Sequence, residues 1–457
     1  MRVETDLLGD VEVPDHALWG AQTERARRHF AVSGRLVNPA LIRAGAEVKK
    51  ACALTNAELG FLPPPVAEAV VRACDEIIAG RWAEQFVTDA LQGGAGTSTN
   101  MNWNEVIAGR ASMLLGAPVS PHDHVNLHQS TNDVYPTALR VAALRGLAAL
   151  EPSLIRLLEA CQAKEREFAG VVKLGRTELR DAVPITLGRE FGAWAAALGR
   201  DRWRIAKCAE RLRETNLGGT AIGTGLAAPR TYIFLAIEKL RDVTRLNLSR
   251  AENLVDATQN LDAFAEVSGI LRAHAVTLSK MAHDLRLMGS GPEGGLGEIE
   301  LPAVQPGSSL MPGKINPVIP EMVQQVCYRV MAHDQEVMLV AMHGELELNA
   351  FLPLLSDALL ETIQLLERAD ALFADHGVAG ITAHVERCRE LMERSREIVT
   401  ALVPRLGHER AVELAQVMAA TGQTVREAVL EKGWMTAAEL DVELAPERLC
   451  QLGWRKE

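Results

Sequence analysis

Long helix-favouring segments, separated by short breaks rich in glycine and proline, dominate the middle of this chain. Several of them are longer than about 25 residues, roughly twice the length of an average globular helix. Helices of that length cannot cover their apolar faces within a small globule, so the pattern predicts an elongated bundle that also packs against other subunits. The expected helical segments are 136–164, 184–217, 232–246, 256–288 and 317–374.

The rest of the chain supports an all-α fold. Strand signals are sparse and aromatic residues make up only 4% of the sequence, which argues against a sandwich, a barrel or a doubly wound sheet. The residues before about Gly20 alternate in polarity and predict a small hairpin or loop. From about Gly377 onward, shorter helices broken at Gly407, Gly422 and Gly433 indicate a separate small helical domain.

The charge and the composition of the chain limit which kinds of ligand it can bind. The 457-residue chain has a net charge of −11, whereas binding to nucleic acid or to an anionic membrane surface needs a concentrated basic face. We therefore expect no nucleic-acid or membrane partner and a small polar molecule as ligand. The seven cysteines are scattered without a CxxC pair, so neither a disulfide framework nor a zinc site is predicted. Charges interrupt every apolar stretch near the N-terminus, which predicts a cytoplasmic protein.

Four segments rich in Gly, Ser, Thr and Asn interrupt the helical pattern, and loops held on a rigid scaffold are where binding groups collect. They are 93–105 (GGAGTSTNMNWNE), 128–133 (HQSTND), 175–184 (GRTELRDAVP) and 289–321, which contains GSSLMPGKINP. Neutral hydrogen-bond donors are dense in these segments, and Lys314 adds a cation. Such a set can bind a carboxylate and can stabilise extra negative charge in a transition state.

Other kinds of site fit these segments less well. No strand signal precedes GGAGTS and no lysine follows it, which argues against a phosphate loop, and GSSLMPGK has Ile315 where a Walker loop has Ser or Thr. The pair His122 and His124 lacks a carboxylate-rich partner segment, so we predict no metal site. The sequence contains no GxSxG hydrolase motif. Three histidines in helical segments are expected to be surface or core residues, namely His283, His333 and His343.

Six blocks, in order along the chain, resemble those of the fumarase/aspartase superfamily. They are GGAGTSTNMNWNEV, HVNLHQSTND, GRTELRDAVP, NLGGTAIGTG, LVDATQNLD and GSSLMPGKINPVIPE, and the resemblance runs from about Glu4 into the C-terminal tail. Within the superfamily, STNMN, GTAIGTG, INPVIPE and ELELN are more similar to aspartate ammonia-lyase than to class II fumarase, argininosuccinate lyase or adenylosuccinate lyase. The resemblance implies three domains at 1–134, 135–385 and 386–457, and a homotetramer with a twenty-helix core and active sites shared by three subunits.

The activity that the resemblance implies is reversible β-elimination of ammonia from L-aspartate to give fumarate. Proton loss beside a carboxylate forms an aci-carboxylate dianion, which the site must stabilise. No organic cofactor is implied, and activation by a divalent cation is left open. The alternatives are a class II fumarase that interconverts fumarate and malate, an aspartase-like amine-lyase acting on a modified amino acid or a betaine, and a non-catalytic protein on the same scaffold.

By the same resemblance, Ser308 is the catalytic base, acting as an oxyanion on a flexible loop that closes over the substrate. A free serine is too weak an acid for this role, so backbone N–H groups must lower its pKa. The other implied roles are a clamp on the reacting carboxylate (Thr97, Ser130, Thr131 and Ser309), a grip on the second carboxylate (Thr177, Lys314 and Asn316) and orientation of the amine (Asn132).

Two residues depart from the family pattern. Glu178 stands where relatives have a histidine or, in some aspartases, a glutamine, and that residue normally lies near the glutamate that corresponds to Glu321. If the two carboxylates meet, they can share a proton, so both are candidate catalytic residues. If Glu178 stays ionised, it can bind a cationic leaving group, which favours an amine-lyase. Glu293 stands where relatives commonly carry arginine, and this change either loosens loop closure, or indicates a substrate with a different charge, or marks a solvated loop residue.

Overall fold

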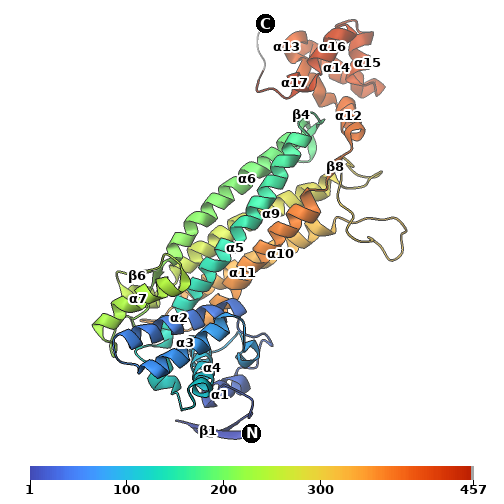
Figure 1. The fold of residues 1–457 in the computed structure, drawn as a ribbon. Helices are drawn as coiled ribbons and strands as arrows, with labels where there is room; N and C mark the ends of the chain where they lie inside the picture. Colours follow the sequence, from blue (N-terminus) through green and yellow to red (C-terminus); the bar gives the residue numbers. More distant parts are fainter. Residues whose placement is uncertain (454–457) are drawn as a thin grey trace. The chain divides into compact units, whose positions relative to one another are not determined.

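The structure is a computed structural model that describes residues 1–453 (Figure 1). The chain divides into two units, which we describe separately. Unit 1 comprises Met1–Pro152, Trp203–Ala275 and Cys327–Glu367, and unit 2 comprises Ser153–Arg202, Val276–Val326 and Arg368–Glu457. The division into three domains stays a prediction, and the last part of its third domain, 454–457, lies outside the described residues.

Helices make up most of the described chain, which confirms the all-α prediction. The longer helices are α1 (Ala21–His29), α2 (Pro39–Glu58), α3 (Pro64–Ile78), α4 (Thr97–Leu115), α5 (Thr131–Glu167), α6 (Leu187–Cys208), α7 (Arg230–Thr244), α9 (Asp262–Met288), α10 (Val318–Met342), α11 (Leu352–Leu372), α12 (Val385–Arg394) and α14 (His408–Thr421). Shorter helices are α8 (Leu254–Gln259), α13 (Val403–Leu406), α15 (Val425–Glu431), α16 (Ala437–Glu443) and α17 (Pro446–Leu449), with 3₁₀ or π turns at Ala83–Gln85, Pro121–Val125, Ala209–Leu212, Phe373–Val378 and Arg396–Leu402.

Strands form small two-stranded sheets in the described chain. They are the antiparallel pairs β1 (Arg2–Asp6) with β2 (Gly9–Val13), β3 (Val172–Thr177) with β4 (Arg180–Thr186) and β7 (Ile299–Glu300) with β8 (Thr382–Ala383), and the parallel pair β5 (Glu214–Thr215) with β6 (Ser249–Arg250). The first pair confirms the hairpin expected at the N-terminus. No helix among the described residues has both the length and the apolar character that a bilayer span requires.

Two of the expected long helices are each divided into a pair. The segment 317–374 forms α10 and α11, because the side chain of Asn349 donates a hydrogen bond of 2.7 Å to the carbonyl of Val340 near the end of α10 and thereby holds the chain in a turn. The segment 256–288 forms α8 and α9, which are separated at Asn260, where the backbone is extended. The expected helix 184–217 is too long at both ends, because α6 spans Leu187–Cys208 between β4 and a 3₁₀ turn at Ala209–Leu212 that leads to β5. The bounds of the other two expected helices differ by a few residues.

The segment GRTELRDAVP was expected to be a loop, and this expectation was wrong, because it forms most of the β3–β4 hairpin. Thr177 pairs with Arg180, and Glu178 and Leu179 make the two-residue turn between them. Both turn residues have positive φ, 54° and 60°, the conformation of a type I′ turn that usually selects asparagine or glycine. The turn is therefore strained, and the sequence carries no ordinary signal for it.

Replacing Leu179 with glycine should relieve part of this strain and raise stability by about 1 kcal/mol, because glycine adopts positive φ without a Cβ clash. The side chain is 76% exposed, so little packing is lost. The measurement is the melting temperature at fixed protein concentration. The control is Leu8→Gly, since Leu8 is an exposed leucine at the β1–β2 turn with ordinary φ, and it should not gain stability. Equal shifts in both variants would contradict the strain argument.

Unit 1 contains α1 to α4, and Figure 1 shows α2, α3 and α4 packed against one another. Helix α2 starts where its sequence predicts, because Asn38 caps its first turn by accepting from the backbone N–H of Ala40, and Pro39 occupies the first helical position. Trp103 of α4 is completely buried, and its indole N–H donates to the carbonyl of Ile42 in α2. These contacts fix α2 against α4, the helix that begins at Thr97.

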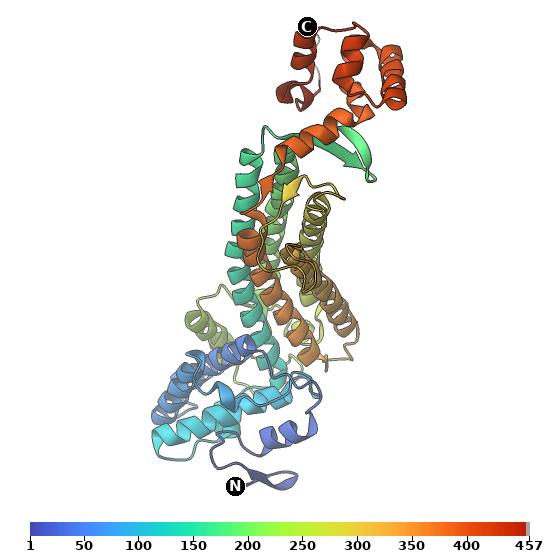
Figure 2. The ribbon, with the colours of Figure 1, turned by 90° about the vertical axis from the view of Figure 1, so that its right-hand side faces the viewer.

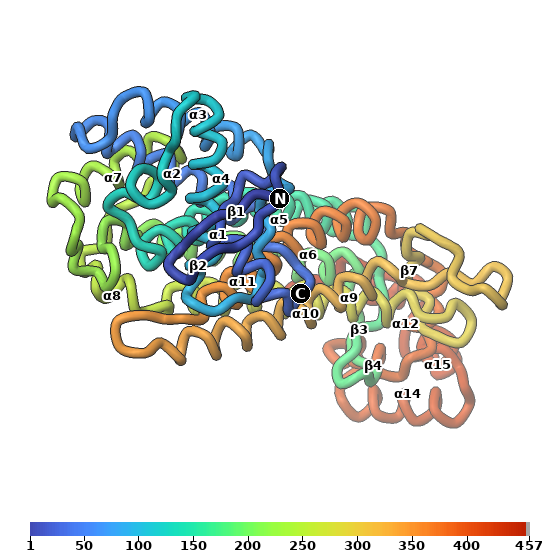
Figure 3. Tube along the Cα trace, turned by 90° about the horizontal axis from the view of Figure 1, so that it is seen from below, coloured from blue at the N-terminus to red at the C-terminus, as the bar shows by residue number. Residues whose placement is uncertain are grey.

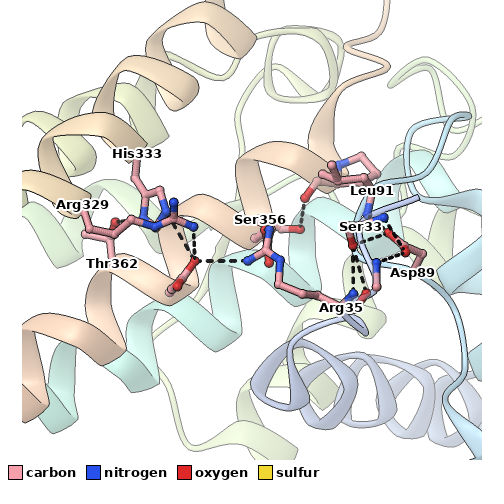
Figure 4. Close-up of polar contacts among 12 residues, drawn as sticks. Ser33, Arg35, Asp89, Leu91, Arg329, His333, Ser356 and Thr362 are labelled. Carbon is pink, nitrogen blue, oxygen red and sulfur yellow. Dashed lines mark hydrogen bonds and ion pairs between the residues drawn. The ribbon is translucent and has the colours of Figure 1, made fainter. Parts of the chain in front are cut away.

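A polar network joins the loop before α2 to α10 and α11 in unit 1 (Figure 4). The carboxylate of Asp89 accepts hydrogen bonds from the hydroxyl of Ser33 at 2.6 Å and from the backbone N–H of Leu91 at 2.8 Å. Arg35 pairs with Asp357 and Glu361. His333 is buried beside Thr362, and its burial lowers its pKa, so it is one of the expected core histidines.

In unit 2, the C-terminal helices pack on the β3–β4 hairpin (Figure 2). Leu174 of β3 belongs to the same buried cluster as Ile398, Leu414 and Val429. The helices of the tail thus share a buried cluster with a strand from the middle of the sequence, and their assignment to a separate small domain stays a prediction. Figure 3 shows the glycine-rich segment before α10, in yellow to orange, as an extended loop beside β7.

Candidate active site

Two of the donor-rich segments form helix starts in unit 1. Thr97 is the first residue of α4, and its hydroxyl donates to the carbonyl of Gly94 at 2.8 Å. A Cβ at Gly96 would lie 2.3 Å from the ring of Tyr135, so only glycine lets the start of α4 approach α5 this closely. Thr131 is the first residue of α5, one turn before Tyr135. The positive partial charge at a helix start favours a bound anion, which suits a carboxylate clamp, although the N–H groups of Thr97, Thr99 and Asn132 already have partners within the protein.

Asp133 fixes the segment HQSTND against the segment NLGGTAIGTG. Its carboxylate is completely buried and accepts hydrogen bonds of 3.0 Å from the backbone N–H groups of Ser130, Gly218 and Thr220. Burial raises the pKa of Asp133 to about 6, and these three donors oppose that shift. Asn132 is held in the same way, because its side-chain amide donates to the carbonyl of Ala221 at 2.8 Å.

The loop that carries Ser308 lies in unit 2 and folds back on itself. The backbone N–H of Gly307 donates to the carbonyl of Lys314 at 2.8 Å, and the side chain of Asn316 donates to the carbonyl of Gly307 at 2.5 Å. A Cβ at Gly307 would lie 2.5 Å from the carbonyl oxygen of Lys314, so the closure requires glycine. The loop is largely exposed, and Leu310 at its tip is 85% exposed.

The hydroxyl of Ser308 is the acceptor of two backbone hydrogen bonds. The N–H groups of Leu310 and Met311 donate to its Oγ at 3.1 and 2.8 Å. Two donors directed at one oxygen stabilise its anionic form, because they supply positive partial charge where an alkoxide would carry its negative charge. The same two hydrogen bonds also occur in an ordinary serine turn, so the role of Ser308 as base stays a prediction. Ser309 is exposed.

A cavity of about 810 Å³ in unit 2 adjoins this loop. Lys314, Asn316 and Glu321 line it, and Nη2 of Arg286 lies 3.7 Å from Oε1 of Glu321. Glu293 lines the same cavity. The structure thus collects the predicted cation and amide beside Glu321 and adds Arg286, which the sequence did not single out. Two histidines also line the cavity, namely His283 and His384.

Thr177 and Glu178 lie at the exposed tip of the β3–β4 hairpin. The described residues that line the 810 Å³ cavity do not include Glu178, so one unit alone does not bring Glu178 to Glu321. Their meeting stays a prediction. Thr97 and the segment HQSTND are in unit 1, whereas Thr177, Ser308 and Lys314 are in unit 2.

A buried ion cluster anchors the hairpin to the base of the loop in unit 2. The carboxylate of Glu298, just before β7, is fully buried, 2.8 Å from Nη1 of Arg176 and 3.2 Å from Nζ of Lys173. Lys173 also pairs with Glu190 of α6 at 2.8 Å, and burial raises the pKa of Glu190. The strand that leads to Thr177 and the segment that leads to Ser308 therefore share one anchor.

Several residues of this arrangement were missed by the sequence analysis. Asp133 lies inside HQSTND but was not assigned a role, although an acidic residue three positions after a serine at a helix start is a known capping signal. Arg286 and Glu298 carry no local signal, because each acts through residues distant in sequence. Within residues 1–453 no three His, Cys, Asp or Glu side chains gather as a metal-binding cluster, and the expectation about metals stays a prediction.

Comparison with known proteins identifies the family. A family model described as "Lyase" matches residues 9–332, and one described as "Fumarase C C-terminus" matches residues 398–451. Aspartate ammonia-lyase of Pseudomonas aeruginosa is 48% identical, covering 98% of this chain and 96% of its own, and that of a Bacillus species is 44% identical, covering 99% and 98%.

Solved structures agree with these matches. A Brucella melitensis protein named fumarate lyase:delta crystallin, solved with cobalt bound, is 51% identical with a TM-score of 0.95, covering 99% of this chain and all of its own. Class II fumarase of Schistosoma mansoni is 34% identical with a TM-score of 0.92, covering 97% and 98%. Because the sequence blocks, the helical fold and full-length relatives all agree, this chain is a lyase and belongs to the fumarase/aspartase superfamily.

Proposed function

We propose that this chain is a carbon–nitrogen lyase of the aspartase type that converts L-aspartate reversibly to fumarate and ammonia. The observation that carries the proposal is the Ser308 hydroxyl, which accepts two backbone N–H hydrogen bonds on a glycine-bounded loop. Relatives named aspartate ammonia-lyase share more identity with this chain than the class II fumarase does, which supports ammonia over water as the leaving group.

The proposed chemistry uses one base and two sets of donors. Ser308, as an alkoxide, removes the proton from the carbon next to one carboxylate. The helix starts at Thr97 and Thr131 stabilise the resulting aci-carboxylate, because the N-terminal end of a helix carries positive partial charge that favours added negative charge. Lys314 and Asn316 bind the second carboxylate, and loop closure excludes water, which strengthens these interactions. The carbon–nitrogen bond then breaks, and its electron pair leaves with the amine.

The direct test follows fumarate by ultraviolet absorbance and ammonia by an independent assay, with L-aspartate and L-malate run in parallel. We expect equal amounts of fumarate and ammonia from L-aspartate and little fumarate from L-malate. Fumarate from L-malate alone would make the chain a fumarase. If neither L-aspartate nor L-malate yields fumarate, whereas a modified aspartate or a betaine releases an amine, the result would support the amine-lyase alternative.

A homotetramer in the cytoplasm, with active sites shared by three subunits, is part of the same proposal. Thr131 and Ser308 are in different units, and Leu310 exposes an apolar side chain at the loop tip. A Thr131→Val protein with weakened substrate binding and an inactive Ser308→Ala protein should therefore show more activity after they are unfolded and refolded together than the sum of the two alone, because mixed tetramers contain some intact sites. No recovery from mixed tetramers of confirmed composition would count against shared sites.

Replacing Glu178 with glutamine is expected to raise KM for L-aspartate about tenfold, since one charge-assisted hydrogen bond to an ammonium is worth about 1.4 kcal/mol. Asp181→Asn is the matched control, because Asp181 is an exposed carboxylate on the same hairpin, and its kinetics should be unchanged. Unchanged kinetics of the Glu178→Gln enzyme at every pH would show that Glu178 takes no part in substrate binding or catalysis.

A further inference from the structure

Lys49 in α2 is a charged side chain in an apolar interior. It is completely buried, and its Nζ donates to Oδ1 of Asn126 and to Oε1 of Gln129, each at 2.9 Å. Both partners are neutral amides. In the described part of the chain no carboxylate lies within ion-pair distance of this ammonium, although an isolated buried charge costs several kcal/mol. The free-energy cost of burying this ammonium among neutral partners suggests that its charge has a role.

The two amides belong to the loop that leads into α5. The side chain of Asn126 donates to the carbonyl of Gln129 at 3.2 Å, and that of Gln129 donates to the carbonyl of Val125 at 2.9 Å. Oδ1 of Asn126 also accepts from the side chains of Asn100 and Asn104 in α4, at 3.2 and 3.1 Å. The ammonium therefore lies at the centre of a network that connects the first turns of α4 with the residues just before Ser130.

The charge of Lys49 is offset only in part, because the carboxylate that acts on it, Asp133, lies beyond ion-pair distance. Asp133 is the nearby carboxylate, and its oxygens already accept from three backbone N–H groups. The starts of α4 and α5 contribute further positive partial charge. Burial lowers the pKa of Lys49 to about 8. The other titratable groups in this region are Cys52 on the same helix, Cys74 on α3, Tyr232 on α7 and His128 in the loop.

We propose that Lys49 is a positioning residue for the substrate, which holds the 125–131 loop through Asn126 and Gln129 and finds its counter-charge in a carboxylate bound at the starts of α4 and α5. The inference rests on the proposed function and deepens it, because it assigns the electrostatic basis of dicarboxylate binding to a residue that does not touch the ligand. It predicts an effect on KM and on ligand affinity that exceeds the effect on kcat.

The test measures binding of succinate, a C4 dicarboxylate that cannot eliminate, by titration calorimetry on the full-length protein. Lys49→Met should weaken succinate binding and raise KM for L-aspartate by about 10- to 100-fold, with a smaller change in kcat. Lys50→Met is the matched control. Lys50 is the next residue, pairs with Asp75 at 2.6 Å away from this network, and should leave affinity within twofold.

The Asn126→Asp variant distinguishes an electrostatic role of Lys49 in substrate binding from a purely structural role. An aspartate there still accepts from Lys49, Asn100 and Asn104, and the buried ion pair that it gives the ammonium outweighs the loss of the 3.2 Å hydrogen bond to the carbonyl of Gln129. A purely structural role predicts unchanged or better affinity together with higher thermal stability. Our proposal predicts at least a tenfold loss of succinate affinity in a folded protein, because the positive charge is neutralised. This variant also decides the question if Lys49→Met does not fold.

Proton linkage gives a second readout. At pH 8 part of Lys49 is neutral, and a bound dianion favours its charged form, so succinate binding should take up a proton. The uptake is read from the dependence of the binding enthalpy on the buffer, and it should be smaller in Lys49→Met. Affinities within twofold of the wild type in both variants would overturn the proposal, as would a wild-type protein that binds no succinate. Succinate binding without ammonia release from L-aspartate would overturn only the proposed substrate.

Discussion

Replacing Ser308 with alanine should lower kcat for ammonia release from L-aspartate by about 10³-fold or more, because the variant loses the group that removes the substrate proton. The two N–H groups that donate to Ser308 Oγ belong to the exposed residues Leu310 and Met311, so they can donate to water once the hydroxyl is gone. The fold should therefore be intact. KM should change little, because the carboxylate donors at Thr97, Thr131 and Lys314 are untouched.

Ser309→Ala is the natural comparison for this variant. It removes an exposed hydroxyl next to Ser308, and its proposed role is to bind a carboxylate rather than a proton. We expect a rise in KM of about tenfold and a modest loss in kcat, as for the loss of one hydrogen bond to a charged group. Stopped assays at high enzyme concentration would quantify both variants. If Ser308→Ala kept kcat within tenfold of wild type, another group would have to be the base.

The sequence predicts those parts of the fold whose signals are local. Helix α2 is an example, because Asn38 and Pro39 mark its start and the run of prolines after Leu62 prevents its continuation. The break between α10 and α11 was missed because it depends on the Asn349 side chain reaching Val340 after folding. The β3–β4 turn was missed because Glu178 and Leu179 occupy positions that usually hold asparagine and glycine.

The same distinction holds for the candidate site. Ser308, Lys314 and Asn316 could be proposed because they sit in one unusual segment, and a motif concentrates their signal. Lys49 was not predicted as a residue of the site, since the side chain of a lysine in a helix normally points to water. A signal was nevertheless present, because Ile42, Gly45 and Lys49 follow a helical spacing that faces the core. A lysine on such a stripe warrants a search for its partner.

Gly45 determines how closely α2 approaches α4. A Cβ at this position would lie 2.1 Å from two ring atoms of Trp103, which is completely buried and held by its hydrogen bond to Ile42. A rigid aromatic ring in a closed core cannot move away without displacing its neighbours. Lys49 follows Gly45 by about one turn, so any shift of α2 also moves the ammonium relative to Asn126.

Gly45→Ala should therefore destabilise the protein by about 3 kcal/mol, although alanine is the better helix former. Gly199→Ala is the matched control: Gly199 also lies inside a helix, α6, but a Cβ there meets nothing within 4 Å, and the change should stabilise by about 1 kcal/mol. Melting temperatures at one protomer concentration compare the two variants, which should move in opposite directions. KM for L-aspartate should rise in Gly45→Ala alone, because the displaced helix carries Lys49. Two upward shifts would show that α2 can retreat from Trp103 without cost, and the close approach of these helices would then not position the substrate loop.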